Sequence, residues 1–117
     1  MTAGRPNVVL LVLDTARAAN LSVHGYEPTT TPNIERVAGN ATVYENAITP
    51  SPWTLPAHAS VLSGLYPSHH GTTRSNAQFA EEIEFLPEIF GKAGYETACI
   101  SANKLLFQDP VLRDSFD

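Results

Sequence analysis

A run of valine and leucine residues near the start of the chain carries its clearest pattern. Residues 7–14 read NVVLLVLD, with apolar side chains at every position between Asn7 and Asp14. An uninterrupted apolar run of this length is typical of a strand that is buried on both faces of a parallel sheet. The pattern therefore predicts such a strand, with the Asp14 carboxylate at its carboxyl end.

Helical and strand-like patterns alternate along the rest of the chain. Thr31 and Pro32 are typical of a helix start, and apolar residues then recur at helical spacing. Helices are predicted over residues 31–39, 57–63 and 83–93, further strands over 42–48 and 95–101, and a loop over 65–80. This order predicts an α/β fold in which a mostly parallel sheet is flanked by helices. Ligand sites in such sheets lie beyond the carboxyl ends of the strands, here at Asp14 and at residues 101–104.

Composition and charge exclude several classes of protein. The 117 residues suit one domain, and a net charge of −5 argues against a nucleic-acid partner, which requires clustered Lys and Arg. The longest apolar run is too short for a membrane segment, and it does not resemble a signal peptide. With Cys99 alone, no intrachain disulfide can form. A cytoplasmic location is therefore expected.

Thr54 and Asp14 are the candidates for chemistry. Thr54 stands just before a helix that Pro56 can start, where free N–H groups and a partial positive charge would stabilise an alkoxide. Asp14 suits a divalent cation as a hard oxygen ligand. A cation that bridges Asp14 and Thr54 would lower the hydroxyl pKa and make Thr54 a nucleophile. The alternatives are that Thr54 only caps the helix and that Asp14 only binds nearby backbone N–H groups.

Sequence blocks covering about residues 5–101 resemble the sulfatase family of the alkaline phosphatase superfamily. They read PNVVLLVLDTAR, TTTPNIERVA, VYENAITPSPWTLPAHASVLSGLYPSHHG and LPEIFGKAGYETACIS. The resemblance implies a large alkaline-phosphatase-like α/β domain with a metal site at the sheet's carboxyl edge. Residues 1–117 would then be the N-terminal part of a single catalytic domain, incomplete and inactive alone, with the remaining metal ligands in the missing C-terminal part.

The resemblance also assigns roles to individual residues. Asp14 matches the first metal-binding Asp, whereas Thr15 replaces the second. The family's nucleophile motif is Cys or Ser, any residue, Pro, any residue, Arg. It falls on residues 54–58, which places Thr54 at the nucleophile and His58 at the arginine. Both are therefore the catalytic candidates.

Substrate contacts are expected from residues on two other segments. The family's Gly-Lys-Trp-His segment falls on residues 101–104, so Lys104 replaces the second catalytic residue and the first is absent. Arg17 could supply the missing positive charge, and Asn103 could contact the substrate. The alternatives are that Arg17 is a solvated surface residue and that Asn103 caps a turn.

A threonine nucleophile changes the expected substrate. Classical sulfatases oxidise their Cys or Ser to formylglycine, whose hydrate expels the sulfate. Oxidation of Thr54 would give a ketone, which hydrates poorly, so no formylglycine is expected. A phosphorylated threonine can be cleaved by metal-activated water. The expected activity is hydrolysis of a small-molecule sulfate or phosphate ester with Ca, Mg, Mn or Zn, and phosphoester transfer is a related possibility.

Two other functions are alternatives to an ester hydrolase. In a noncatalytic sulfatase-like domain the core would persist while the site decays, and the replacements at Thr15, His58 and Ala102 favour that reading. A flavodoxin-like nucleotide-binding module is disfavoured, because no Gly-rich phosphate loop follows the first predicted strand.

Overall fold

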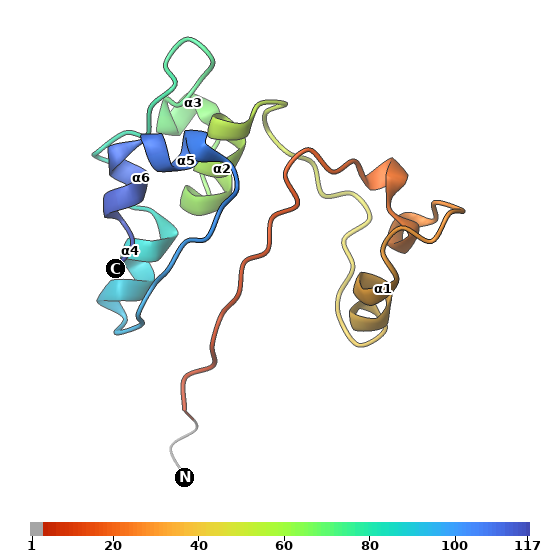
Figure 1. Ribbon diagram of the computed structural model, residues 1–117. Coiled ribbons are helices and arrows are strands. Elements are labelled where there is room, and N and C mark those ends of the chain that lie inside the picture. The colour runs from red at the N-terminus through yellow and green to blue at the C-terminus, as the bar shows by residue number, and fades with distance from the viewer. Residues whose placement is uncertain (1–3) are drawn as a thin grey trace. The chain divides into compact units, whose positions relative to one another are not determined.

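The computed structural model describes residues 4–117, and they divide into two compact units. The first unit ends at Ala47 and the second covers Ile48–Asp117. Figure 1 shows helices in both units, joined by extended segments and loops. Each unit is described by itself below.

The predicted parallel sheet is wrong, because no segment of residues 4–117 forms a strand. The segments expected to be strands, 7–14, 42–48 and 95–101, have no regular secondary structure apart from short turns. Side chains of the run from Val8 to Leu13 are between 43% and 87% exposed. A strand is completed by hydrogen bonds to a neighbouring strand, so an apolar pattern alone does not create one.

The first unit contains two 3-10 turns and one helix. They are η1 (Ala18–Asn20), η2 (Ser22–His24) and α1 (Pro32–Ala38). Thr31 precedes α1 as predicted, but its hydroxyl accepts the N–H of Val23 at 3.1 Å instead of capping the helix. The Ser22 hydroxyl in turn accepts the Thr31 N–H at 2.9 Å. These reciprocal bonds fasten η2 to the start of α1.

The second unit is a cluster of short helices. They are α2 (Thr54–Ser63), α3 (Pro67–His70), α4 (Leu86–Lys92), α5 (Lys104–Gln108) and α6 (Pro110–Asp114). Proline at the first or second position starts α3, α4 and α6, where its missing N–H is not needed. Gly64 ends α2 with a φ of 71°, a left-handed conformation that glycine adopts without a side-chain clash.

The bounds of the later segments of this unit differ from the prediction. The helix expected over 83–93 begins only at Leu86, where the Glu88 carboxylate reaches back to accept the Phe85 N–H at 2.7 Å, as the third helical residue does in one half of a capping box. The loop expected over 65–80 contains the single turn α3, which Pro67 starts.

The buried core of the described residues belongs to the second unit. Phe79 and Phe85 meet edge to face with ring centroids 5.1 Å apart, the geometry that aromatic pairs favour. Helices α2, α5 and α6 each contribute to the same cluster. Its buried members are Leu55, Ala59, Phe79, Phe85, Leu106 and Leu112.

Candidate active site around the start of helix α2

Thr54 is the first residue of α2, with Trp53 as the N-cap. Leu55 is 5% exposed and Ala59 is fully buried, so the first turns of the helix are anchored in the core. Thr54 itself is half-buried. The helix therefore begins three residues earlier than its predicted start at 57. Thr54 is thus the first helical residue, one position after the N-cap.

The side chain of His58 turns back along the helix to Thr54. Its Nδ1 lies 2.8 Å from the Thr54 carbonyl oxygen. A carbonyl oxygen only accepts, so Nδ1 carries the hydrogen and Nε2 holds the lone pair of the neutral ring. His58 thus contacts Thr54 through the backbone, and its Nε2 can donate to an anion only when the ring is protonated.

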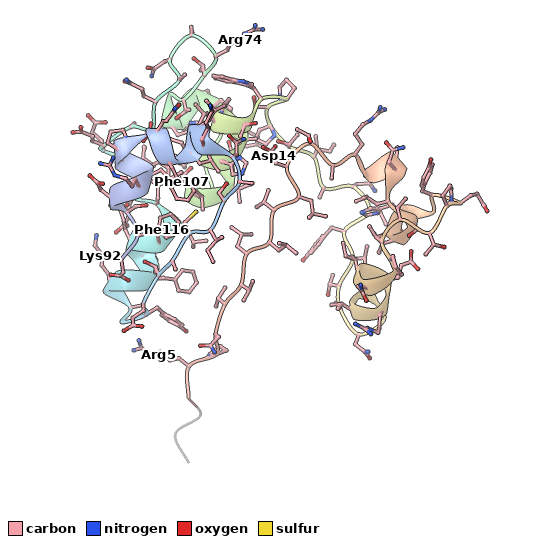
Figure 2. All side chains as sticks on the ribbon, viewed as in Figure 1. Arg5, Asp14, Arg74, Lys92, Phe107 and Phe116 are labelled. Atoms are coloured by element: carbon pink, nitrogen blue, oxygen red, sulfur yellow. The ribbon has the colours of Figure 1, made fainter. Side chains whose placement is uncertain are left out.

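Asp14 lies in a turn that closes the extended N-terminal segment, as Figure 2 shows. The turn is closed by the Ala16 N–H, which donates to the Leu13 carbonyl at 3.2 Å. Thr15, its third residue, has a φ of 63°. A β-branched residue rarely adopts a left-handed conformation, so the backbone beside Asp14 is strained.

Asn103 and Lys104 stand at the start of α5. The Asn103 side-chain oxygen accepts the Leu105 N–H at 3.1 Å, so this residue caps a helix, whereas the alternative had it cap a turn. Lys104 is the first residue of the helix and is exposed. Substrate contact by either residue stays a prediction.

The predicted site residues fall into both units. Thr54 and His58 are in contact, and Asn103 and Lys104 belong to the same unit on a helix that shares the α2 core. Asp14 and Arg17 belong to the first unit, where Arg17 is exposed and precedes η1. Over residues 4–117 no three His, Cys, Asp or Glu side chains gather as a metal-binding group.

Ser60, on the same helix as Thr54, was not among the predicted site residues. Ser60 is 8% exposed on α2, and its hydroxyl lies 2.9 Å from Nε2 of the buried His70. The sequence did carry a signal for this contact. Ser60 directly follows Ala59 and so places a hydroxyl on the apolar face of a short helix. A buried polar group of this kind is expected to have a hydrogen-bond partner.

Comparison with known proteins agrees with the motifs around this helix. The profile of the Sulfatase family matches residues 6–111, nearly the whole chain. The chain therefore belongs to the sulfatase family. Among its relatives is an arylsulfatase of Clostridium perfringens, 35% identical over 97 residues, which are 82% of this chain and 20% of that protein.

Other relatives carry different sulfatase names. The N-acetylgalactosamine-6-sulfatase of Homo sapiens is 33% identical over 103 residues, covering 77% of this chain and 20% of that protein. An N-acetylglucosamine-6-O-sulfatase of Bacteroides thetaiotaomicron is 27% identical over 96 residues, 82% of this chain and 17% of that protein. This chain thus spans about a fifth of the length of these relatives. No solved structure gave a significant match.

Two further observations concern the family's chemistry and the length of the helices. Sulfatases are generally metal-dependent hydrolases, and the relatives' names identify them with sulfate esters. Within the described residues, every helix is too short or too polar to cross a membrane.

Proposed function

We propose that this chain supplies the nucleophile-bearing part of a metal-dependent ester hydrolase, with Thr54 as the nucleophile. The observation that supports this most directly is the position of Thr54 as the first residue of α2. The first N–H groups of a helix lack intrahelical acceptors, and the helix dipole favours negative charge there. Oxygen charge that develops on Thr54 or on a bound ester would be stabilised by these groups.

The reaction follows from the threonine hydroxyl. The Thr54 oxygen attacks the phosphorus or sulfur of the ester, and the bond to the leaving alcohol breaks. The proton lost by Thr54 balances the proton taken up by the leaving oxygen. Water then cleaves the threonine ester, which releases phosphate or sulfate and restores the hydroxyl. His58, protonated, would donate from Nε2 to the anion, with its Nδ1–H held by the Thr54 carbonyl.

The oxygen donors in the described residues suit a divalent cation. The Asp14 carboxylate and the Thr54 hydroxyl are hard ligands of the kind that Ca²⁺ and Mg²⁺ take. Such a cation, when bound, lowers the pKa of a hydroxyl and offsets the charge of the ester. Two protein ligands are few for either ion. We therefore infer that the chain is the N-terminal part of a larger catalytic domain, consistent with its coverage of about a fifth of the relatives.

The substrate we infer is a small sulfate or phosphate ester. Family membership supports the sulfate ester, whereas the threonine alcohol supports the phosphate ester, because Thr54 cannot give the aldehyde on which formylglycine chemistry depends. Thr54 is therefore expected to be unmodified. Mass spectrometry of the peptide that contains it, from the protein made in its own host, would detect oxidation as the loss of two hydrogens.

A noncatalytic sulfatase-like domain is the second candidate. It is favoured by the contact of His58 with a backbone carbonyl, which takes one nitrogen away from catalysis. The side-chain oxygen of Asn103 is likewise committed to capping α5. Under this alternative, neither ester is hydrolysed and added divalent ions leave the unfolding temperature unchanged.

The test is an assay of the complete protein that contains this chain. Turnover of 4-nitrophenyl sulfate and of bis(4-nitrophenyl) phosphate is measured with Mn²⁺, Ca²⁺ or Zn²⁺. Thr54→Ala is expected to lower kcat on the order of 10³-fold or more, as for loss of a nucleophile. Thr49→Ala is the control, since the Thr49 hydroxyl donates only to the Ser51 carbonyl outside the helix. Full activity of the Thr54 variant would reject the mechanism, and an inactive parent would favour the noncatalytic domain.

A further inference from the structure

His70 is a buried titratable residue that the proposed reaction does not use. It ends α3 and is only 1% exposed. Both of its ring nitrogens have partners: Nε2 lies 2.9 Å from the Ser60 hydroxyl, and Nδ1 accepts the Thr72 N–H at 3.1 Å. The ring therefore connects α2 to the loop that follows α3.

The partners of His70 define its tautomer. A backbone N–H can only donate, so Nδ1 must hold a lone pair when it receives the Thr72 N–H. The ring hydrogen then resides on Nε2, which donates to the Ser60 hydroxyl. A protonated ring would set an N–H against the Thr72 N–H, so the arrangement requires a neutral His70. Burial lowers the pKa of His70 below its ordinary value of 6.5 and acts in the same direction.

Hydrogen bonds continue from His70 to the start of α6. The Thr72 hydroxyl donates to the Gln78 carbonyl at 2.9 Å, and the next residue, Phe79, donates its N–H to Asp109 at 2.8 Å. Asp109 also accepts the Leu112 N–H and so caps α6. Thr72 is fully buried and Asp109 is 6% exposed. Helix α2 is thus linked through buried polar groups to α6, as well as by apolar contacts.

The two kinds of contact constrain a helix differently. Apolar contacts are non-directional, so Leu55 and Ala59 hold α2 against the core without fixing its rotation closely. A hydrogen bond weakens steeply when its angle or length changes. The Ser60 bond therefore adds a directional restraint on the rotation and the axial position of the helix whose first residue is Thr54.

We propose that His70 is a positioning residue that holds Thr54 in register through Ser60, an inference that rests on the proposed function. The Nε2–H bond to Ser60 restrains α2, whereas the bond between Nδ1 and the Thr72 N–H orders the loop that follows α3. A small displacement of a nucleophile lowers the rate of the chemical step much more than it lowers substrate affinity.

Substitutions at position 70 can keep one of the two ring hydrogen bonds and remove the other. Gln at position 70 can place an amide N–H near the site of Nε2, and Asn can place a carbonyl oxygen near the site of Nδ1. His70→Gln thus retains the bond to Ser60, and His70→Asn retains the bond to Thr72. Ser60→Ala removes the same bond from α2. Ser63→Ala is the matched control, because the Ser63 hydroxyl donates to the Ala59 carbonyl within the helix.

The expected result is a split between kcat and KM in the complete protein. Ser60→Ala and His70→Asn should lower kcat about tenfold with KM within about twofold, since binding groups stay while the nucleophile shifts. His70→Gln and Ser63→Ala should retain kcat within about threefold. An equal loss of kcat in His70→Gln and His70→Asn, or a change in KM alone, would overturn the proposal.

Two readouts on the 117-residue chain do not depend on activity. Nitrogen-15 NMR of the imidazole rings should show His70 neutral with its hydrogen on Nε2. Hydrogen exchange of the Ala57 and His58 amides, in the first turn of α2, should be about fivefold faster in Ser60→Ala than in Ser63→Ala, the effect of one hydrogen bond.

These readouts separate the two possible failures. If the wild-type complete protein hydrolyses neither ester, the proposed function fails, and exchange in the first turn of α2 decides whether His70 holds Thr54 in place. Faster exchange in Ser60→Ala and His70→Asn supports the positioning role. Unchanged exchange, or a ring hydrogen on Nδ1, would overturn it.

Discussion

At the scale of single residues, the backbone conformation of Thr15 stands apart. Its φ of 63° is the only positive value at a non-glycine residue among residues 4–117. For a β-branched side chain this conformation costs on the order of 1–3 kcal/mol. The strain lies next to Asp14, the candidate metal ligand, at the position where the sulfatase pattern has a second Asp.

Replacing Thr15 by Asn should relieve this strain. Asn tolerates the left-handed region much better than a β-branched residue, so Thr15→Asn is expected to raise the free energy of unfolding by about 1 kcal/mol. Urea unfolding followed by circular dichroism measures the change. Thr29→Asn, at an exposed position with negative φ, is the control and should have little effect. Equal changes in both variants would contradict the role assigned to strain.

At the scale of secondary-structure elements, local sequence determined where helices begin and end. Pro67 starts α3, Gly64 ends α2, and Asn103 caps α5, all through interactions within a few residues. Such signals can be recognised in sequence because helix hydrogen bonds are local. The cap of α6 differs, because the Asp109 carboxylate accepts the nearby Leu112 N–H and also the Phe79 N–H, thirty residues away in the sequence.

The two capping residues should differ in their effect on stability. Asp109→Ala removes a helix cap and leaves the buried Phe79 N–H without its acceptor, so a loss of about 3 kcal/mol is expected. Asn103→Ala removes a cap whose bond to Leu105 is exposed, and a loss of about 1 kcal/mol is expected. Urea unfolding of both variants tests the difference. Equal losses would show that the bond to Phe79 contributes nothing.

At the scale of the whole molecule, apolar residues are distributed unevenly between the two units. The buried cluster described here draws on the second unit alone, including Phe85, which is fully buried. The first unit carries the apolar run from Val8 to Leu13, and these side chains are largely exposed. Stability in the described residues is therefore expected to come mainly from residues 48–117.

Substitutions in the two units should reveal this asymmetry. Phe85→Ala leaves a cavity and breaks the aromatic pair with Phe79, and about 3–5 kcal/mol should be lost. Val9→Ser, at a position that is 87% exposed, should change the free energy of unfolding by less than about 0.5 kcal/mol. Comparable losses in the two variants would show that the Val and Leu run is buried in solution.

The neutral His70 makes stability depend on pH. Because its pKa is lowered in the folded chain, the unfolded chain binds more protons as pH falls below about 6.5. Stability from His70 is therefore present above that pH and is lost as the pH falls toward the lowered pKa. Between pH 7.5 and 5, unfolding temperatures should fall more steeply in the wild type than in His70→Gln. Parallel pH profiles would contradict this expectation.

Sequence by itself determined the sulfatase family and the helical neighbourhood of Thr54. Motif identity and helix signals depend on residues close together along the chain, which is why these predictions held. Tertiary structure alone decided the rest. The predicted strands find no partner strand among residues 4–117. The Thr31 hydroxyl accepts the Val23 N–H, and the Ser60 hydroxyl is hydrogen-bonded to His70. Each of these depends on which distant groups come together, because strand pairing and buried hydrogen bonds require a partner that a local pattern does not name.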